Sequence, residues 1–346
     1  MPVLLALLAA AALPPAPPRF ALAWAAAPAA TAASLDPVRG ALPGASDAEA
    51  TAWRDLKAYA DACILKSAEA TRTELRALGY EPTALSSGAY TDRTCRAAQG
   101  LLVVRAQYDT WEAFAAARRE AWPAFAAYRA AVRNAESVAQ NRVEAVSDGK
   151  AAAAPLGERL AARVVGEQVL RLASADLSGD DGPSPPVTEQ VSAGARPLLE
   201  ALLSVETARH DERNTDWLRA EVERSGWPAR STVGGAGAEA AWLLVQHADH
   251  DPAFQARMLK LMAPLAARGD VPRRNYAFLY DRVMMKVAGR QRYATQYRCE
   301  NGHYRPAALE DPARVEALRA EAGLGTVAEN TARIERLYGR SCAAGD

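Results

Sequence analysis

Hydrophobic and polar positions repeat with a helical period along most of this chain. Between residues 47 and 77, Trp53, Leu56, Ala60 and Ile64 recur at the spacing that places them on one face of a helix. Pro123 is expected to interrupt or kink the next tract, because proline removes a backbone donor. Further helices are predicted over residues 93–146, 155–177, 189–209, 213–225, 238–248, 252–268, 275–288, 311–322 and 327–338.

Local signals place the ends of some elements. Asp251 followed by Pro252 is the N-cap and first-turn pair that starts a helix, and Asp311 followed by Pro312 repeats the device. The stretch from Tyr293 to Cys299 alternates up to an Asn-Gly turn at 301–302, which is typical of a hairpin. The predicted fold is therefore mainly α, with one or more helical bundles and one small β-hairpin near 291–305.

Two stretches rich in glycine, proline and serine separate the predicted helices. "SGDDGPSPP" (Ser178–Pro186) favours a loop and is the best domain boundary in the chain. We therefore expect an N-terminal helical region over 47–177, a linker over 178–188 and a C-terminal helical domain over 189–340. "STVGGAG" (231–237) lacks a P-loop lysine and is interpreted as a turn that lets two helices pack closely.

The N-terminal segment, residues 1–33, resembles a secretory leader. Its apolar run of about ten residues is too short to span a bilayer but fits the hydrophobic part of a signal peptide. Ala23 with Ala25, and Ala30 with Ala32, offer cleavage sites, although no basic residue precedes Arg19. The segment is interpreted as a signal peptide or an Ala/Pro-rich disordered leader, and a periplasmic or secreted location is predicted.

The cysteines indicate possible disulfides, and the charge balance indicates which partners to expect. In an oxidising compartment, pairing Cys63 with Cys95 and Cys299 with Cys342 is the simplest of three connectivities, and four free thiols are the alternative. Lys plus Arg and Asp plus Glu both number 41, so no net field attracts nucleic acid or an anionic membrane. Neither a nucleic-acid partner nor a membrane span in the mature protein is expected.

Five polar blocks occur in the C-terminal half of the chain. They are "GWPARSTVG" (226–234), "QHAD" (246–249), Gln255, "LYDR" (279–282) and "GRQRYATQ" (289–296). Their order and spacing resemble a bacterial family, domain of unknown function 6624, whose members carry GWP, QHAD, DR and YGTQ blocks over a region equivalent to residues 189–338. The resemblance implies a shared fold and brings no established reaction. Ala294 stands where the family block has glycine, which leaves a positive φ at this position in question.

The blocks predict a site but leave its chemistry open. A His-x-x-His metal pair, His247 with His250, would need a third ligand such as Asp249, Asp251, Asp281 or His303, and it lacks the usual i,i+4 spacing. No metal and no cofactor are therefore predicted. As a general base, His247 would be oriented by Asp249 or Asp281, and these three are the candidate catalytic residues.

Ligand binding and packing are the other interpretations. The candidate ligand-binding residues are Arg282, Gln291, Tyr293 and Gln296, which would bind a small polar molecule or peptide. In the alternative, the same polar groups join the helices of a structural or protein-interaction bundle without any chemistry. The sequence thus predicts an exported helical protein with a polar binding or hydrolytic site, or such a bundle.

Overall fold

The computed structural model describes residues 68–85, 111–147, 154–177 and 191–339, with isolated positions at 58, 102, 104, 107–108, 149–150, 152 and 342. The predicted mainly α fold is confirmed. The leader, the 178–188 linker, and Cys63 and Cys95 lie outside the described residues. The domain division at 178–188 stays a prediction.

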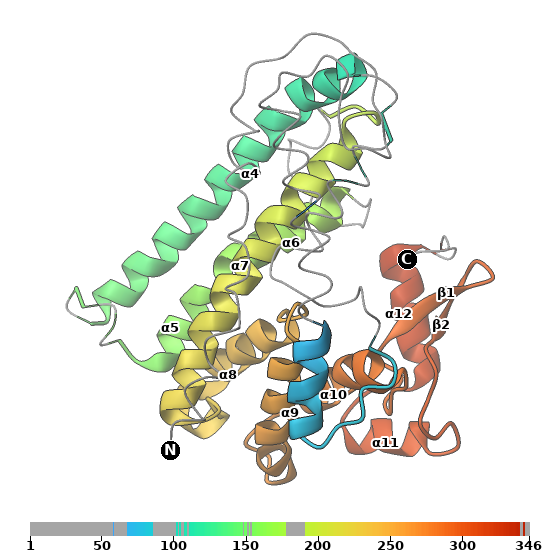
Figure 1. The fold of residues 1–346 in the computed structure, drawn as a ribbon. Helices are drawn as coiled ribbons and strands as arrows, with labels where there is room; N and C mark the ends of the chain where they lie inside the picture. The colour runs from blue at the N-terminus through green and yellow to red at the C-terminus, as the bar shows by residue number, and fades with distance from the viewer. Residues whose placement is uncertain are drawn as a thin grey trace, which may run out of the picture.

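Three long helices run side by side and enclose the first hydrophobic cluster (Figure 1). Phe114, Leu170 and Leu199 are fully buried in it, one from each helix. Helices on both sides of residues 178–188 therefore share one core. The elements are α4 (Trp111–Ala145), α6 (Val165–Leu177) and α7 (Arg196–Ser225), and α5 (Leu156–Arg163) precedes α6.

A second hydrophobic cluster lies around α8 (Arg230–Gln246), α9 (Pro252–Ala267) and α10 (Arg273–Ala288). The end of α7 reaches it through Leu218 and Val222, and residues 68–77 form a helix that adds Leu75. Because α7 contributes to both clusters, it connects the two parts of the molecule (Figure 1).

The C-terminal part begins with the predicted hairpin, β1 (Tyr297–Glu300) and β2 (His303–Pro306). Asn301 and Gly302 both have positive φ, as a two-residue hairpin turn requires. α11 (Val315–Glu321) and α12 (Val327–Tyr338) follow. The predicted Cys299–Cys342 disulfide is present and links β1 to the residues after α12.

Some predicted helix ends were wrong. α7 is one helix, although a break was expected between residues 209 and 213, because the polar side chains of His210 and Asp211 find partners on neighbouring helices. α4 is not interrupted at Pro123, since packing on α6 and α7 outweighs one lost hydrogen bond, and a kink there stays a prediction. The helix expected over 155–177 is divided at Val164, and α8 starts earlier than residue 238, with its non-helical point at Gly234.

Over the described part of the chain, the helices lack the combination of length and apolar character that a membrane span requires.

Candidate functional site

The chain turns between α8 and α9, and this corner, residues 247–251, carries two of the three predicted catalytic residues, His247 and Asp249. α8 ends at Gln246, with His247 as its C-cap. Asp251 caps α9 as predicted, because its Oδ1 accepts a hydrogen bond of 2.8 Å from the N–H of Phe254. Asp251 also pairs with Arg219 of α7 at 2.6 Å. His247 and Asp249 therefore lie outside both helices, where their side chains can meet groups from other elements.

His247 is bound to a carboxylate from a distant helix. Its Nδ1 lies 2.6 Å from Oε1 of Glu167 on α6, and the other oxygen of Glu167 accepts a 2.9 Å hydrogen bond from Nδ2 of Asn214 on α7. Glu167 is fully buried, whereas the His247 side chain keeps 15% of its surface exposed. The pair therefore joins a buried charge to a ring that solvent reaches.

Protonation follows from this arrangement. Burial raises the pKa of Glu167, but the hydrogen bonds and charges of His247 and its other neighbours outweigh it and hold the pKa below the usual range. Burial is also the main reason that the pKa of His247 is lowered, although the hydrogen bond that His247 donates to Glu167 raises it. A carboxylate only accepts, so Nδ1 carries the proton and Nε2 keeps its lone pair.

A second carboxyl group, Asp211 on α7, lies beside this pair. Arg171 of α6 donates to both of its oxygens, at 2.7 and 2.8 Å. Burial, aided by the negative charge of Glu167, raises the pKa of Asp211 to about 8 against the effect of Arg171. The pKa of Asp211 is thus raised while that of Glu167 is lowered. Such divergence between neighbouring carboxyls is a pattern of acid–base sites.

The same three side chains are the donor set that could hold a metal ion. Glu167, Asp211 and His247 each offer an atom within 4.8 Å of the others. Two carboxylates and an imidazole suit a divalent cation such as zinc or manganese. Arg171 already places a positive charge on Asp211, so a cation would compete with it. This set differs from the His247–His250 pair considered from the sequence.

The side chain of Asp249 points toward α10 and not toward the His247–Glu167 pair. Nε of Arg282 donates to its Oδ1 at 2.7 Å, Lys286 also pairs with it, and Gln255 of α9 donates at 3.2 Å. Burial would raise the pKa of Asp249, but Lys286 and Arg282 hold it well below the usual range. Asp249 is therefore an ionised anchor that fixes the corner to α9 and α10.

Asp281, adjacent to Arg282 on α10, organises the loop before β1. This fully buried carboxylate accepts from the N–H groups of Arg292, Tyr293 and Thr295 at 2.7 to 3.0 Å, and from the Thr295 hydroxyl at 2.9 Å. Burial still raises its pKa, against these hydrogen bonds. Ala294 lies within this loop with φ of 50°, so the left-handed conformation that glycine would favour is kept by alanine.

The other predicted ligand-binding residues belong to the same loop. Gln291 is fully buried, and its amide donates to the carbonyls of Gln296 and Ala307 at 2.8 and 3.0 Å. Tyr293 packs edge-on against Tyr280, and Gln296 donates to the Thr295 hydroxyl at 3.1 Å. The hydrogen bonds of the predicted residues thus form two groups: His247, Asp249 and Arg282 around the corner, and Asp281, Gln291, Tyr293 and Gln296 in the loop.

Glu167 and Asp211 were absent from the sequence-based site. A signal for Glu167 exists, because it lies three residues before Leu170 on the same helix face, and Leu170 is fully buried. A charged residue on an apolar face needs a partner. Nothing local identifies that partner, which lies 80 residues away.

Comparison with known proteins gives one match. Residues 187–342 match the model of a family of unknown function (DUF6624), which confirms the resemblance of the motif blocks. His247, Asp249 and Asp211 lie inside the matched region, and Glu167 lies before it. No curated protein and no solved structure matches the chain.

Proposed function

We propose that this protein binds a small polar molecule at the corner of residues 247–251 and that His247 exchanges a proton with it or with a bound water. The observation that carries the proposal is the 2.6 Å contact between Nδ1 of the partly exposed His247 and the buried Glu167. It fixes the tautomer and leaves Nε2 as the basic nitrogen.

In this proposal the two carboxyl groups have different roles. Ionised Glu167 orients the ring and stabilises the imidazolium that forms when Nε2 takes a proton. Asp211, with its pKa raised to about 8, is the neighbouring acid that can return a proton. A positioned general base contributes a rate factor of roughly 10² to 10⁴.

The remaining predicted residues hold the site together in this proposal. Asp249 and Arg282 position the corner, and Asp281 and Gln291 position the loop, because their polar atoms are already bound to the protein. Tyr293 and Gln296 belong to that loop, which shares no hydrogen bond with His247 among the described residues, so the proposal gives them no contact with the ligand.

Two buried polar atoms near the cluster support a ligand. Nε of Arg171, the residue that pairs with Asp211, and Oε1 of Gln246, the residue before His247, have no hydrogen-bond partner among the described atoms. A buried polar atom without a partner costs about 1 to 3 kcal/mol. A bound molecule or water that satisfied these atoms would recover that cost.

The competing function is a non-catalytic bundle in which the cluster only joins α6, α7, α8 and α10. His247→Asn separates the two, since asparagine can keep the donor to Glu167 while the basic nitrogen is lost. The matched control is His303→Asn on the exposed hairpin. A library of small polar metabolites is screened by thermal shift, together with chromogenic ester, amide and phosphoester substrates.

The proposal expects at least one stabilising or hydrolysed compound that acts on the wild type and His303→Asn but not on His247→Asn. Equal responses of all three proteins, or a stability loss in His247→Asn without any compound-dependent difference, would support the structural bundle. Elemental analysis of the same samples is expected to find no stoichiometric metal. One equivalent of divalent metal, lost in Asp211→Asn, would overturn the proton-transfer proposal.

Export is part of the proposal. The leader-like segment of residues 1–33 and the Cys299–Cys342 disulfide support it, because disulfides persist mainly in oxidising compartments. N-terminal sequencing of the protein recovered from the periplasm or medium is expected to begin after Ala25 or Ala32. Recovery only from the cytoplasm with an uncleaved leader would contradict export.

A further inference from the structure

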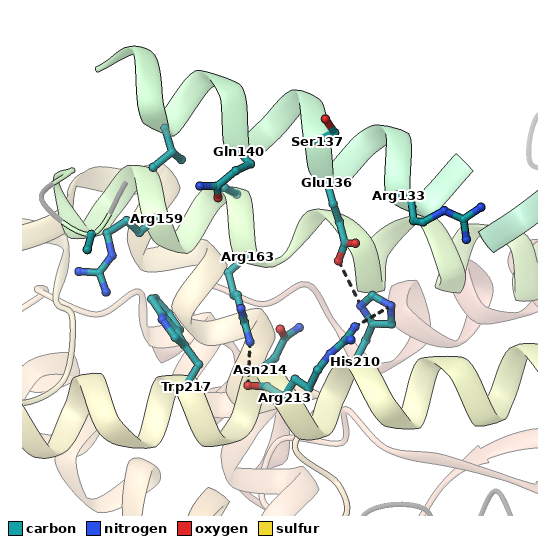
Figure 2. A pocket seen from close by; sticks show the side chains of 13 residues that line it. Arg133, Glu136, Ser137, Gln140, Arg159, Arg163, His210, Arg213, Asn214 and Trp217 are labelled. Carbon is teal, nitrogen blue, oxygen red and sulfur yellow. Dashed lines mark hydrogen bonds and ion pairs between the residues drawn. The ribbon is translucent and has the colours of Figure 1, made fainter. Parts of the chain in front are cut away.

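A polar pocket lies between α4, α5 and α7, outside the corner of residues 247–251 (Figure 2). Its volume is about 690 Å³, which is in the range of small-molecule sites. Figure 2 shows Arg163 reaching from α5 toward α7, and Arg213 lying beside His210. Its main polar lining consists of Arg133, Glu136, Arg159, Arg163, Arg213 and Asn214.

The charges in this pocket are unbalanced. Arg159 pairs with Glu221, which leaves Arg133, Arg163 and Arg213 without an ion pair to any carboxylate of the described residues. Glu136 is the single acidic side chain of the lining. The unpaired lining groups therefore carry three positive charges against one negative charge.

Arg163 is the most confined of these cations. One terminal nitrogen donates to the backbone carbonyl of Arg213 at 2.9 Å, and its Nε is buried without a partner among the described atoms. Its guanidinium also lies 5.6 Å from the centre of the Trp217 ring. Burial and the nearby charge of Arg213 lower the pKa of Arg163. Two cations held close together with little compensation are stabilised by an anion.

His210 orients Arg213 without adding charge. Burial, with the charge of Arg213, lowers the pKa of His210 to about 4, so the ring is neutral at pH 7. Its Nε2 accepts from Arg213 at 3.1 Å, and its Nδ1 lies 3.4 Å from Oε1 of Glu136. The ring therefore positions one cation of the pocket while Glu136 lies on its far side.

We propose that this pocket binds a small phosphate-bearing molecule, with Arg163 and Arg213 as the anchoring pair, Arg133 at the exposed rim and Trp217 against its apolar part. Guanidinium forks match phosphate oxygens in geometry and charge. The volume exceeds that of one phosphate group, so an organic portion or a second phosphate fits beside it. This inference is independent of the proposed function of His247, although Asn214 contacts both sites through Glu167.

Calorimetry of the full chain at low ionic strength tests the proposal, with inorganic phosphate, pyrophosphate, a hexose phosphate and citrate as separate probes. Arg213→Gln removes an anchoring charge from an exposed position, and Arg336→Gln on α12 is the matched control. We expect a phosphate probe to bind the wild type and the control, and Arg213→Gln to weaken it about tenfold or more. Tighter binding of the hexose phosphate than of inorganic phosphate would identify an organic ligand.

Glu136→Gln provides a test of opposite sign. Loss of the pocket's carboxylate is expected to tighten phosphate binding several-fold, a gain that a damaged fold would not produce. The proposal is wrong if no phosphate probe binds at low salt, if citrate binds as tightly as the phosphates, or if Arg213→Gln and Arg336→Gln bind equally. It is also wrong if Glu136→Gln weakens binding.

Discussion

Ala294 illustrates how single residues carry conformational strain in this fold. A non-glycine residue at positive φ costs about 1 to 2 kcal/mol, yet Ala294 adopts φ of 50°. The N–H groups of Tyr293 and Thr295, on either side of it, are bound to Asp281. Those bonds determine the backbone path, and alanine accepts the strain.

Ala294→Gly is therefore expected to change the free energy of unfolding by less than about 1 kcal/mol, because relieved strain offsets the buried methyl and the added chain entropy. Ala256→Gly, also fully buried but inside α9, has no strain to relieve. It should cost about 2 kcal/mol through helix propensity and the lost methyl. Urea denaturation of both variants measures the difference. Equal losses would contradict this account of Ala294.

His210 makes stability depend on pH. Its pKa falls from 6.5 in the unfolded chain to about 4 in the folded one. Below pH 6.5 the unfolded chain therefore binds a proton at His210 that the folded protein does not, and the free energy of unfolding decreases until the pH reaches about 4. The full decrease in the free energy of unfolding is about 3 kcal/mol. Between pH 7 and 4.5, the wild type should lose about 2 to 3 kcal/mol more than His210→Gln. Asp211 acts with the opposite sign, but in both proteins, so it cancels in the difference. Equal losses would show that His210 is not buried in its neutral form.

At the scale of elements, α5 and α8 approach closely because of glycine. A Cβ on Gly157 would lie 2.4 Å from the carbonyl oxygen of Val233, and one on Gly237 would lie 2.7 Å from Cα of Gly157. The stretch 231–237 was predicted to be a turn between two closely packed helices, but it lies within α8, where Gly237 permits the close packing on α5. Gly235, in the same stretch, has no atom within 4 Å of its Cβ position.

Gly237→Ala should destabilise the protein by about 1 to 3 kcal/mol, since backbone atoms cannot move aside cheaply. Gly235→Ala should be neutral or stabilising by up to about 1 kcal/mol through helix propensity. Thermal denaturation of the two variants is the measurement. A similar midpoint for both would show that α5 and α8 are further apart than described.

Sequence patterns predicted the ends of elements better when the signal lay within a few residues than when it depended on partners from other helices. The cap at Asp251 with Pro252 and the turn at Asn301 with Gly302 act within a few residues, and both are present. The helix start predicted at Asp311 with Pro312 was wrong, because residues 312–314 form a turn and α11 begins at Val315. The expected break at 210–212 failed because polarity was interpreted as exposure. His210 and Asp211 are instead polar groups of an interior helix face, whose partners Glu136 and Arg171 lie on other helices.

At the scale of the whole molecule, the candidate site is assembled from segments far apart in sequence. The motif blocks predicted Asp249 and Arg282, which form one polar cluster with Lys286, and His247, which binds Glu167. They could not predict Glu167 or Asp211, because no spacing rule relates residues of different helices across a bundle. Asp281 belongs to the loop and not to the corner, because its carboxylate accepts hydrogen bonds from backbone N–H groups of the loop. A motif of side chains does not reveal such bonds.

The disulfide affects the stability of the whole molecule. Cys299–Cys342 closes a loop with a sequence separation of 43 that contains β2, α11 and α12. Cys299→Ser with Cys342→Ser is expected to lower the free energy of unfolding by about 2 to 4 kcal/mol, mainly by freeing the unfolded chain. Denaturation of the wild type and the double variant without reductant measures this loss. An unchanged midpoint would contradict a closed disulfide.

The central claim is that His247 is a neutral base whose Nδ1–H is bound to Glu167. Nitrogen NMR of the imidazole, titrated from pH 4 to 9 in the wild type and in Glu167→Gln, tests it most directly. The account predicts the Nδ1–H tautomer at pH 7 and a wild-type pKa below 6.5. It also predicts a lower pKa in Glu167→Gln, because the carboxylate raises it. A charged ring at pH 7, the Nε2–H tautomer, or a pKa unaffected by Glu167→Gln would contradict the account.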